Sequence, residues 1–162
     1  MVKPAKIYPI EYYMKEVKVI TFLGKREIPE AKTLKYLKAI RAPRKDRSEN
    51  AEDALCTSEG LIHECTVCSF FGVKEQRTIT AEDVIHNRIT KKTVIELIKD
   101  KIQIDYKFIH VSEISTLDEV FLASLGHGIK PVVPIDKTTV GKPESITKRI
   151  MKESEAYTGN GL

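Results

Sequence analysis

Apolar and polar positions alternate most clearly in the middle of the chain, where they predict a hairpin. A short β-rich run at 54–57 meets a turn containing Gly60, and a longer run rises over 61–73. On the longer run the odd positions form an apolar stripe of Leu61, Cys65, Val67, Phe71 and Val73. Glu64 lies in the middle of this run. An ionised carboxylate there either has a cationic or hydrogen-bonded partner, or points to water from an edge strand.

The same reasoning predicts the helices and strands in the rest of the chain. Runs of β-branched residues predict strands at 17–22, 78–80, 102–111, 119–123 and 131–135. Apolar residues at helical spacing predict helices that start at Thr33, run over 91–100 with Thr90 as N-cap, and follow the turn at 141–147. A short helix is predicted at 112–117.

Strands and helices are mixed without strict alternation, which is typical of an α+β (mixed α/β) domain. We therefore expect a mixed, largely antiparallel sheet packed by helices. Residues 1–16 look like an extended entry segment, and 17–162 like one domain.

Composition narrows the class of protein. The charged fraction of 31% and the hydrophobic fraction of 41% are typical of a soluble globular domain and not of a disordered chain. The net charge of +4 permits an anionic ligand without requiring one. We expect no membrane span and no secretory signal, because no apolar run is long enough. An odd number of cysteines, three, does not form a disulfide framework, so we expect a reducing, cytoplasmic location.

Two cysteines with metal-ligand spacing, Cys65 and Cys68, are one candidate site. With His63, and with His86 or Cys56, they could bind zinc. A structural zinc site usually has a second CxxC pair, which this sequence lacks. On a continuous strand residues 65 and 68 would also point to opposite faces. The pattern therefore favours buried structural cysteines over a metal site.

Two further patterns have both a functional and an ordinary interpretation. Basic residues gather over 41–47, but acidic residues interleave with them and no aromatic residue accompanies them, which favours a solvated surface over a nucleic-acid site. Ile89 and Thr90 precede a predicted helix, where free N–H groups and the helix dipole favour a phosphate. A plain N-cap explains Thr90 equally well.

Short motifs in a fixed order carry a family resemblance. They lie at 30–37, 52–74, 88–97, 118–136 and 141–149. In order and spacing they resemble the C-terminal domain of fold-type IV pyridoxal-phosphate enzymes. That group includes branched-chain amino-acid aminotransferases, D-alanine aminotransferases and aminodeoxychorismate lyases. The resemblance extends from about Lys3 to the end of the chain. It implies that 1–16 is an interdomain-linker-like entry segment and that 17–162 is the PLP-binding, C-terminal-type domain.

The resemblance implies a cofactor, pyridoxal 5'-phosphate, and a set of site residues. Lys32 matches the Schiff-base lysine, which moves a proton between substrate and cofactor. Glu64 matches the carboxylate that pairs with the pyridinium nitrogen. The positions matching the phosphate and substrate site are Ile89, Thr90, Ser124 and Leu125. The implied partners are an amino acid and a 2-oxo acid, most readily of the branched-chain type, in a cytoplasmic homodimer without nucleic-acid or membrane binding.

Some positions depart from the family pattern. Lys35 and Ser69 stand where asparagine is usual, Arg88 replaces a glycine, and Leu125 replaces a hydroxyl-bearing residue. The family's N-terminal domain, with its phosphate-binding arginine, has no counterpart in these 162 residues. We therefore expect impaired transamination by this chain alone. The alternatives are a non-catalytic domain of the same fold and a lyase resembling aminodeoxychorismate lyase.

Overall fold

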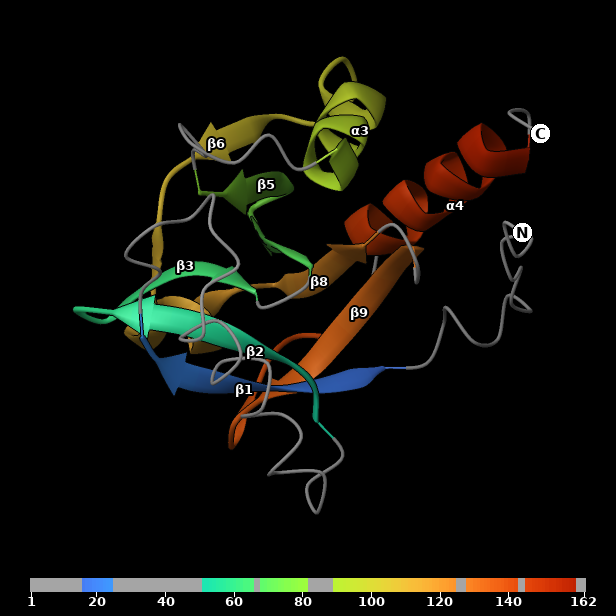
Figure 1. Ribbon diagram of the computed structural model, residues 1–162. Coiled ribbons are helices and arrows are strands. Elements are labelled where there is room, and N and C mark those ends of the chain that lie inside the picture. Colours follow the sequence, from blue (N-terminus) through green and yellow to red (C-terminus); the bar gives the residue numbers. More distant parts are fainter. Residues whose placement is uncertain are drawn as a thin grey trace.

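The computed structural model describes residues 16–24, 51–65, 68–81, 89–124, 128–142 and 145–159. Figure 1 shows a strongly curled sheet with helices packed beside it. The elements are β1 (Val17–Leu23), β2 (Ala51–Ser58), β3 (Leu61–Cys65), β4 (Ser69–Lys74), β5 (Arg77–Thr80), α3 (Ile89–Ile98), β6 (Ile104–Tyr106), β7 (Ile109–His110), the 3₁₀ helix η2 (Val111–Thr116), β8 (Glu119–Ser124), β9 (Gly128–Ile135), β10 (Thr138–Thr139) and α4 (Ser145–Gly159). No helix among these residues has the length and apolar character needed to cross a membrane.

The strands form a ten-stranded sheet in the order β6-β5-β4-β8-β9-β1-β2-β3-β7, with β10 paired to β9. β1 runs parallel to β2 and β9, β5 runs parallel to β6, and the other pairs are antiparallel. Only residues 107–108 separate β6 from β7, although these strands end opposite edges of the order. The sheet must therefore curl until its edges approach each other. This confirms the expected α+β fold with a mixed, largely antiparallel sheet.

Alternation along the central strands divides the buried side chains between two clusters. In β8, Val120 and Leu122 join the inner cluster, inside the curled sheet, whereas Phe121 and Ala123 join the outer cluster under α3 and α4. Phe121 stacks on Phe71 of β4, with ring centroids 4.9 Å apart and planes inclined by 6°. Burying a side chain of this size contributes about 2–3 kcal/mol. The two helices are thereby held against the outer face of β4, β8 and β9.

Two predicted strands are each divided in the structure. The strand predicted over 102–111 becomes β6, which pairs with β5, and β7, which pairs with β3 on the other half of the sheet. The long strand predicted over 61–73 ends at Cys65 as β3 and resumes at Ser69 as β4. The prediction of a single apolar stripe is therefore wrong, because Cys65 belongs to the inner cluster and Phe71 to the outer one. The alternation restarts because the chain passes from one half of the sheet to the other.

Several other predictions are confirmed, with small differences. The strands predicted at 17–22, 78–80, 119–123 and 131–135 match β1, β5, β8 and β9. The terminal helix is α4, whose buried residues include the predicted Ile146, Ile150 and Met151. Helix α3 begins at Ile89, so Thr90 is its second residue and the N-cap prediction is wrong. The helix predicted from Thr33 and the segment 1–16 lie outside the described residues.

Candidate functional site

The positions that the resemblance selects are only partly described. Lys32 and Leu125 lie outside the described residues, as does the side chain of Glu64. The backbone of Glu64 belongs to β3 and is paired with Cys56 of β2. Ile89 and Thr90 form the start of α3, and Ser124 ends β8. The structure therefore describes the backbone at Glu64, Ile89, Thr90 and Ser124, and the role of Lys32 stays a prediction.

An irregularity in the β2–β3 ladder lies directly beside Glu64. Glu64 is paired with Cys56, but the next pair joins Ile62 to Thr57, so the register shifts and His63 is passed over. Such a bulge changes the direction of neighbouring side chains, and bulges are common next to active sites. β3 is also not a free edge at its start, because Ile62 pairs with Ile109 of β7. The ladder fixes the backbone of Glu64 beside two buried residues, its partner Cys56 and the following Cys65.

The start of α3 has the electrostatic character of an anion site. The first N–H groups of a helix lack intrahelical partners, and the dipole is positive at that end. The first turn of α3 contains no acidic residue. Ile89 is 67% exposed and Thr90 is half-buried, so solvent reaches this turn. The residues present therefore fit a phosphate group at this position.

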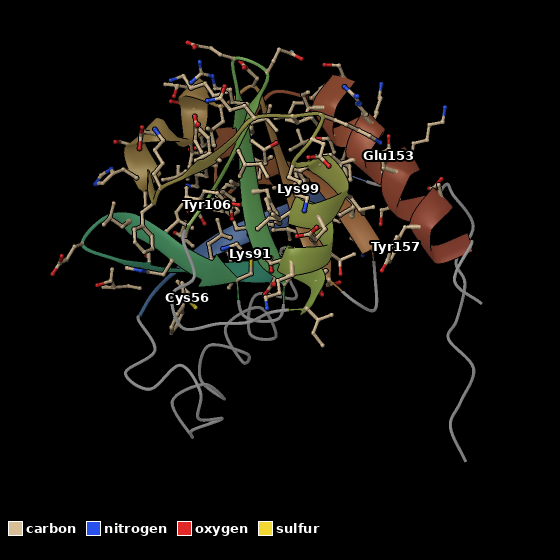
Figure 2. All side chains as sticks on the ribbon, turned by 90° about the horizontal axis from the view of Figure 1, so that it is seen from above. Cys56, Lys91, Lys99, Tyr106, Glu153 and Tyr157 are labelled. Atoms are coloured by element: carbon tan, nitrogen blue, oxygen red, sulfur yellow. The ribbon has the colours of Figure 1, made fainter. Side chains whose placement is uncertain are left out.

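A buried lysine follows this turn. Lys91 is buried on the side of α3 that faces the sheet, and its Nζ donates a hydrogen bond to the carbonyl of Ala81 (Figure 2). This bond ties the helix start to the residue that follows β5. The sequence pattern gave no sign of it, because a lysine in the first turn of a helix is ordinarily solvated.

The end of β8 lies on an element that packs against α3. Ser124 is paired with Gly128 of β9, whose φ of 63° is left-handed. The residue before it, Ala123, shares the outer cluster with Val94 of α3. Ser124 and Thr90 thus belong to neighbouring elements, as a shared phosphate and substrate site would need.

Two charged residues inside the sheet were missed by the sequence reasoning. Lys130 of β9 is 5% exposed and stands opposite Leu122 of β8. Directly opposed residues of an antiparallel pair share a face, so Lys130 lies on the same face as the inner cluster. Asp53 of β2 is 1% exposed. The sequence signal was a single charged residue within an apolar run, which alone does not separate a buried group from a solvated one.

Asp53 lies with two cysteines. The Cys68 thiol donates a hydrogen bond of 2.6 Å to Oδ2 of Asp53, whose Oδ1 accepts one of 2.7 Å from the Ala54 N–H. The hydrogen bond with Cys65, followed by burial, raises the pKa of the Cys68 thiol well above its ordinary value. The prediction that Cys65 and Cys68 point to opposite faces is wrong, because no continuous strand joins them.

Of the other predicted zinc ligands, His63 and Cys56 are described, and neither joins this cluster. The ring of His63 packs edge-on against Phe108, with centroids 5.0 Å apart. Cys56 of β2 is buried (Figure 2) but is not one of the clustered metal-ligating residues found in the described part of the chain. His86 lies outside that part.

Known proteins resemble this chain in sequence and in fold. The family model for amino-transferase class IV matches residues 5–135. Branched-chain-amino-acid aminotransferase-like protein 2 of Arabidopsis thaliana is 31% identical over 119 residues, which cover 70% of this chain and 21% of that protein. A protein of Aquifex aeolicus named as a branched-chain-amino-acid aminotransferase is 33% identical over 107 residues, 62% of this chain and 34% of that one. The chain therefore spans about a fifth of the length of the first relative and about a third of the length of the second.

Solved structures agree in fold. A hypothetical aminotransferase of Mycobacterium tuberculosis, in a form with alpha-ketoglutarate and PMP bound, superposes with a TM-score of 0.79 at 18% identity, covering 96% of this chain and 60% of that one. The branched-chain amino acid aminotransferase of Escherichia coli gives a TM-score of 0.74 at 22% identity, covering 89% and 52%. At these identities the likeness establishes the curled α+β fold and nothing finer.

Proposed function

The chain belongs to the class IV aminotransferase family, and we propose that it is the lysine-bearing domain of a pyridoxal 5'-phosphate-dependent aminotransferase. Its substrates are an amino acid, of branched-chain type, and a 2-oxo acid, and it works as a homodimer. The observation that carries this proposal is the family match over residues 5–135, which contains every proposed site residue. The names of the two sequence relatives favour branched-chain substrates.

Lys32 is proposed to hold the cofactor covalently and to move the proton at the substrate carbon. An amine that does this must be neutral, so its pKa must lie below that of a solvated lysine. The cofactor, when bound, supplies an electron sink for the carbanion that forms after proton removal. Lys32 is thus the one residue whose loss should end covalent attachment while leaving the fold intact.

Glu64 is proposed to keep the cofactor's ring nitrogen protonated. A carboxylate that accepts a charge-assisted hydrogen bond holds a cation more firmly than a neutral acceptor does. The bulge at His63 supports this role, because it interrupts the regular alternation directly before Glu64.

The phosphate is proposed to bind at the start of α3. Ile89 and Thr90 offer backbone N–H groups there, Thr90 adds a hydroxyl, and the first turn carries no opposing acidic charge. Ser124 and Leu125 are proposed to line the adjoining substrate site. Leu125 offers no hydroxyl, which weakens phosphate binding and is consistent with impaired activity of this chain alone.

Reductive trapping tests the proposal. The chain is incubated with pyridoxal 5'-phosphate, reduced with borohydride, digested and mapped by mass spectrometry. We expect modification at Lys32, lost in Lys32→Ala and retained in Lys35→Ala, a lysine three positions away in the same predicted helix. Labelling spread over many lysines, unchanged in Lys32→Ala, would contradict the enzyme and favour a non-catalytic domain. Specific labelling at Lys32 with cleavage of an aminodeoxychorismate-like substrate, and no amino transfer to a 2-oxo acid, would favour the lyase.

A further inference from the structure

Three buried side chains of types that bind metals meet between β3 and β4, two strands that are consecutive in the chain but are not paired with each other in the sheet. Asp53 comes from β2, Cys65 ends β3, and Cys68 directly precedes β4. β3 is hydrogen-bonded to β2 and β7, whereas β4 is hydrogen-bonded to β5 and β8. No ladder therefore joins β3 to β4 in the described residues. The cluster lies where a link between these strands is missing.

The cluster is compact and buried. Asp53, Cys65 and Cys68 are 1%, 0% and 6% exposed, and their ligand atoms all lie within 4.8 Å of one another. Cys68 Sγ and Asp53 Oδ2 are 2.6 Å apart. Packing an acid and two thiols this closely in an apolar interior is costly unless a proton or a cation lies between them. In the described structure the Cys68 proton fills that role.

We propose that Asp53, Cys65 and Cys68 form a binding site for a thiophilic divalent cation of the zinc class. Two sulfur ligands select such an ion over magnesium or calcium, which prefer oxygen. Binding forms two metal–sulfur bonds and one metal–oxygen bond, and releases the two thiol protons to solvent. A water molecule completes the four-coordinate shell, as in zinc sites with three protein ligands.

The structure needs only small movements to accommodate the ion. Tetrahedral zinc with ordinary bond lengths sets ligand sulfur and oxygen atoms about 3.5 Å apart and two sulfurs about 3.8 Å apart. The Cys68–Asp53 pair must therefore open by about 0.9 Å, which side-chain rotation supplies. The Ala54 N–H holds Oδ1 of Asp53, leaving Oδ2 as the metal-facing oxygen. Hydrogen bonds of this kind orient metal ligands in known sites.

The proposed metal has a structural role that is independent of the aminotransferase proposal. It would join β2, β3 and β4 at one point, next to Glu64. Unfolding would separate the three ligands. The ion would therefore raise the free energy of unfolding, and by more the more tightly it binds. It would also fix the end of β3 that follows the bulge.

Cobalt titration of the reduced chain under anaerobic conditions tests the site. We expect one equivalent of Co²⁺ to bind and produce an ultraviolet thiolate-to-cobalt charge-transfer band that Zn²⁺ abolishes and Mg²⁺ does not. Cys65→Ser and Cys68→Ser should each remove most of the band, and Asp53→Asn should weaken the affinity by tenfold or more. Cys56→Ser is the matched control. Cys56 is buried like the two cluster cysteines but lies in β2 outside the cluster, so its loss should leave the band intact.

Three results would overturn the proposal. One is a wild-type chain that shows no charge-transfer band, even if the variants cannot be tested because they fail to fold. The second is an equal loss of the band in Cys56→Ser and Cys68→Ser. The third is a reduced wild-type chain whose melting temperature is unchanged by Zn²⁺ while mass spectrometry finds a Cys65–Cys68 disulfide after exposure to air, because the pair would then be a redox pair and not a metal site.

Discussion

The carboxylate of Glu119 in β8 accepts a hydrogen bond of 2.8 Å from the backbone N–H of Thr147 in the first turn of α4. Its other oxygen accepts a bond of 3.2 Å from the N–H of Ile146. Glu119 is 2% exposed, and the first turn of α4 has no acidic residue of its own. A strand residue therefore does what an N-cap and a dipole-compensating acid do in other helices. This anchors α4 on the sheet.

Replacing this anchor should destabilise the chain. Glu119→Ala leaves two buried N–H groups without their acceptor, and we expect a loss of about 2–4 kcal/mol in the free energy of unfolding. Glu119→Gln keeps one acceptor and should cost less. Urea denaturation measures both. Glu96→Ala, on the exposed side of α3, is the control and should cost only a small fraction of this, because its ion pair with Lys99 is solvated. Equal losses for Glu119→Ala and Glu96→Ala would show that the hydrogen bonds to α4 contribute nothing.

Gly141 should tolerate no side chain. A Cβ at this position would lie 1.8 Å from the carbonyl oxygen of Asp118, a backbone atom that cannot rotate away. We expect Gly141→Ala to cost about 3 kcal/mol or more, or to prevent folding. Thr139→Ala, in the exposed part of β10, is the control and should leave the melting temperature within a few degrees of wild type. A Gly141→Ala chain that melts with the control would contradict the close approach.

Thr21 and Asp136 should be energetically coupled. Oδ1 of Asp136 accepts a bond of 2.8 Å from the Thr21 N–H, and Oδ2 accepts one of 2.7 Å from its hydroxyl. These bonds tie β1 to the turn between β9 and β10, where Asp136 has a φ of 53°. A double-mutant cycle of Thr21→Ala and Asp136→Asn should give a coupling of about 1 kcal/mol. Since Thr21→Ala keeps the backbone N–H, coupling near zero would mean that the bond from the Thr21 hydroxyl is replaced by water at no loss.

Glu153 should make the stability depend on pH in acid. The hydrogen bond from Lys101, at 2.6 Å, lowers the pKa of Glu153. Since the folded pKa lies below the unfolded one, this stabilisation is fully present above the unfolded pKa and is lost as pH falls through the folded pKa. The stability difference between wild type and Glu153→Gln should thus be larger at neutral pH than at pH about 3. Because both groups are exposed, high salt should reduce the difference. A difference that is unchanged between the two pH values would contradict the ion pair.

Glu64 should govern cofactor retention if the proposed function holds. Glu64→Gln removes the charge that would pair with the ring nitrogen while keeping the shape of the side chain. We expect pyridoxal 5'-phosphate to bind at least tenfold more weakly, a loss of about 1.4 kcal/mol in binding free energy. Absorbance or equilibrium dialysis measures the affinity. Glu59→Gln, in the exposed turn of the same hairpin, is the control. The role of Glu64 would be refuted by equal affinities in the two variants.

The local elements and the family could be predicted from the sequence. The run at 119–123 became β8, and Ile146 and Ile150 became the buried side of α4, because apolar spacing alone decides which face an element buries. The family resemblance likewise rests on short motifs, and the match over 5–135 confirms it. The assigned site residues, Lys32 above all, stay predictions.

The partners of each strand were decided only by the tertiary structure. A regular period cannot reveal that the chain leaves one half of a curled sheet after Cys65 and enters the other half at Ser69. That crossing restarts the alternation and brings Cys68 to Asp53, fifteen positions earlier in the chain. Periodicity reports the face of one element, whereas strand pairing depends on how distant segments close around a shared core. The sequence by itself thus determined the elements and the family, and the closure of the sheet decided which side chains meet.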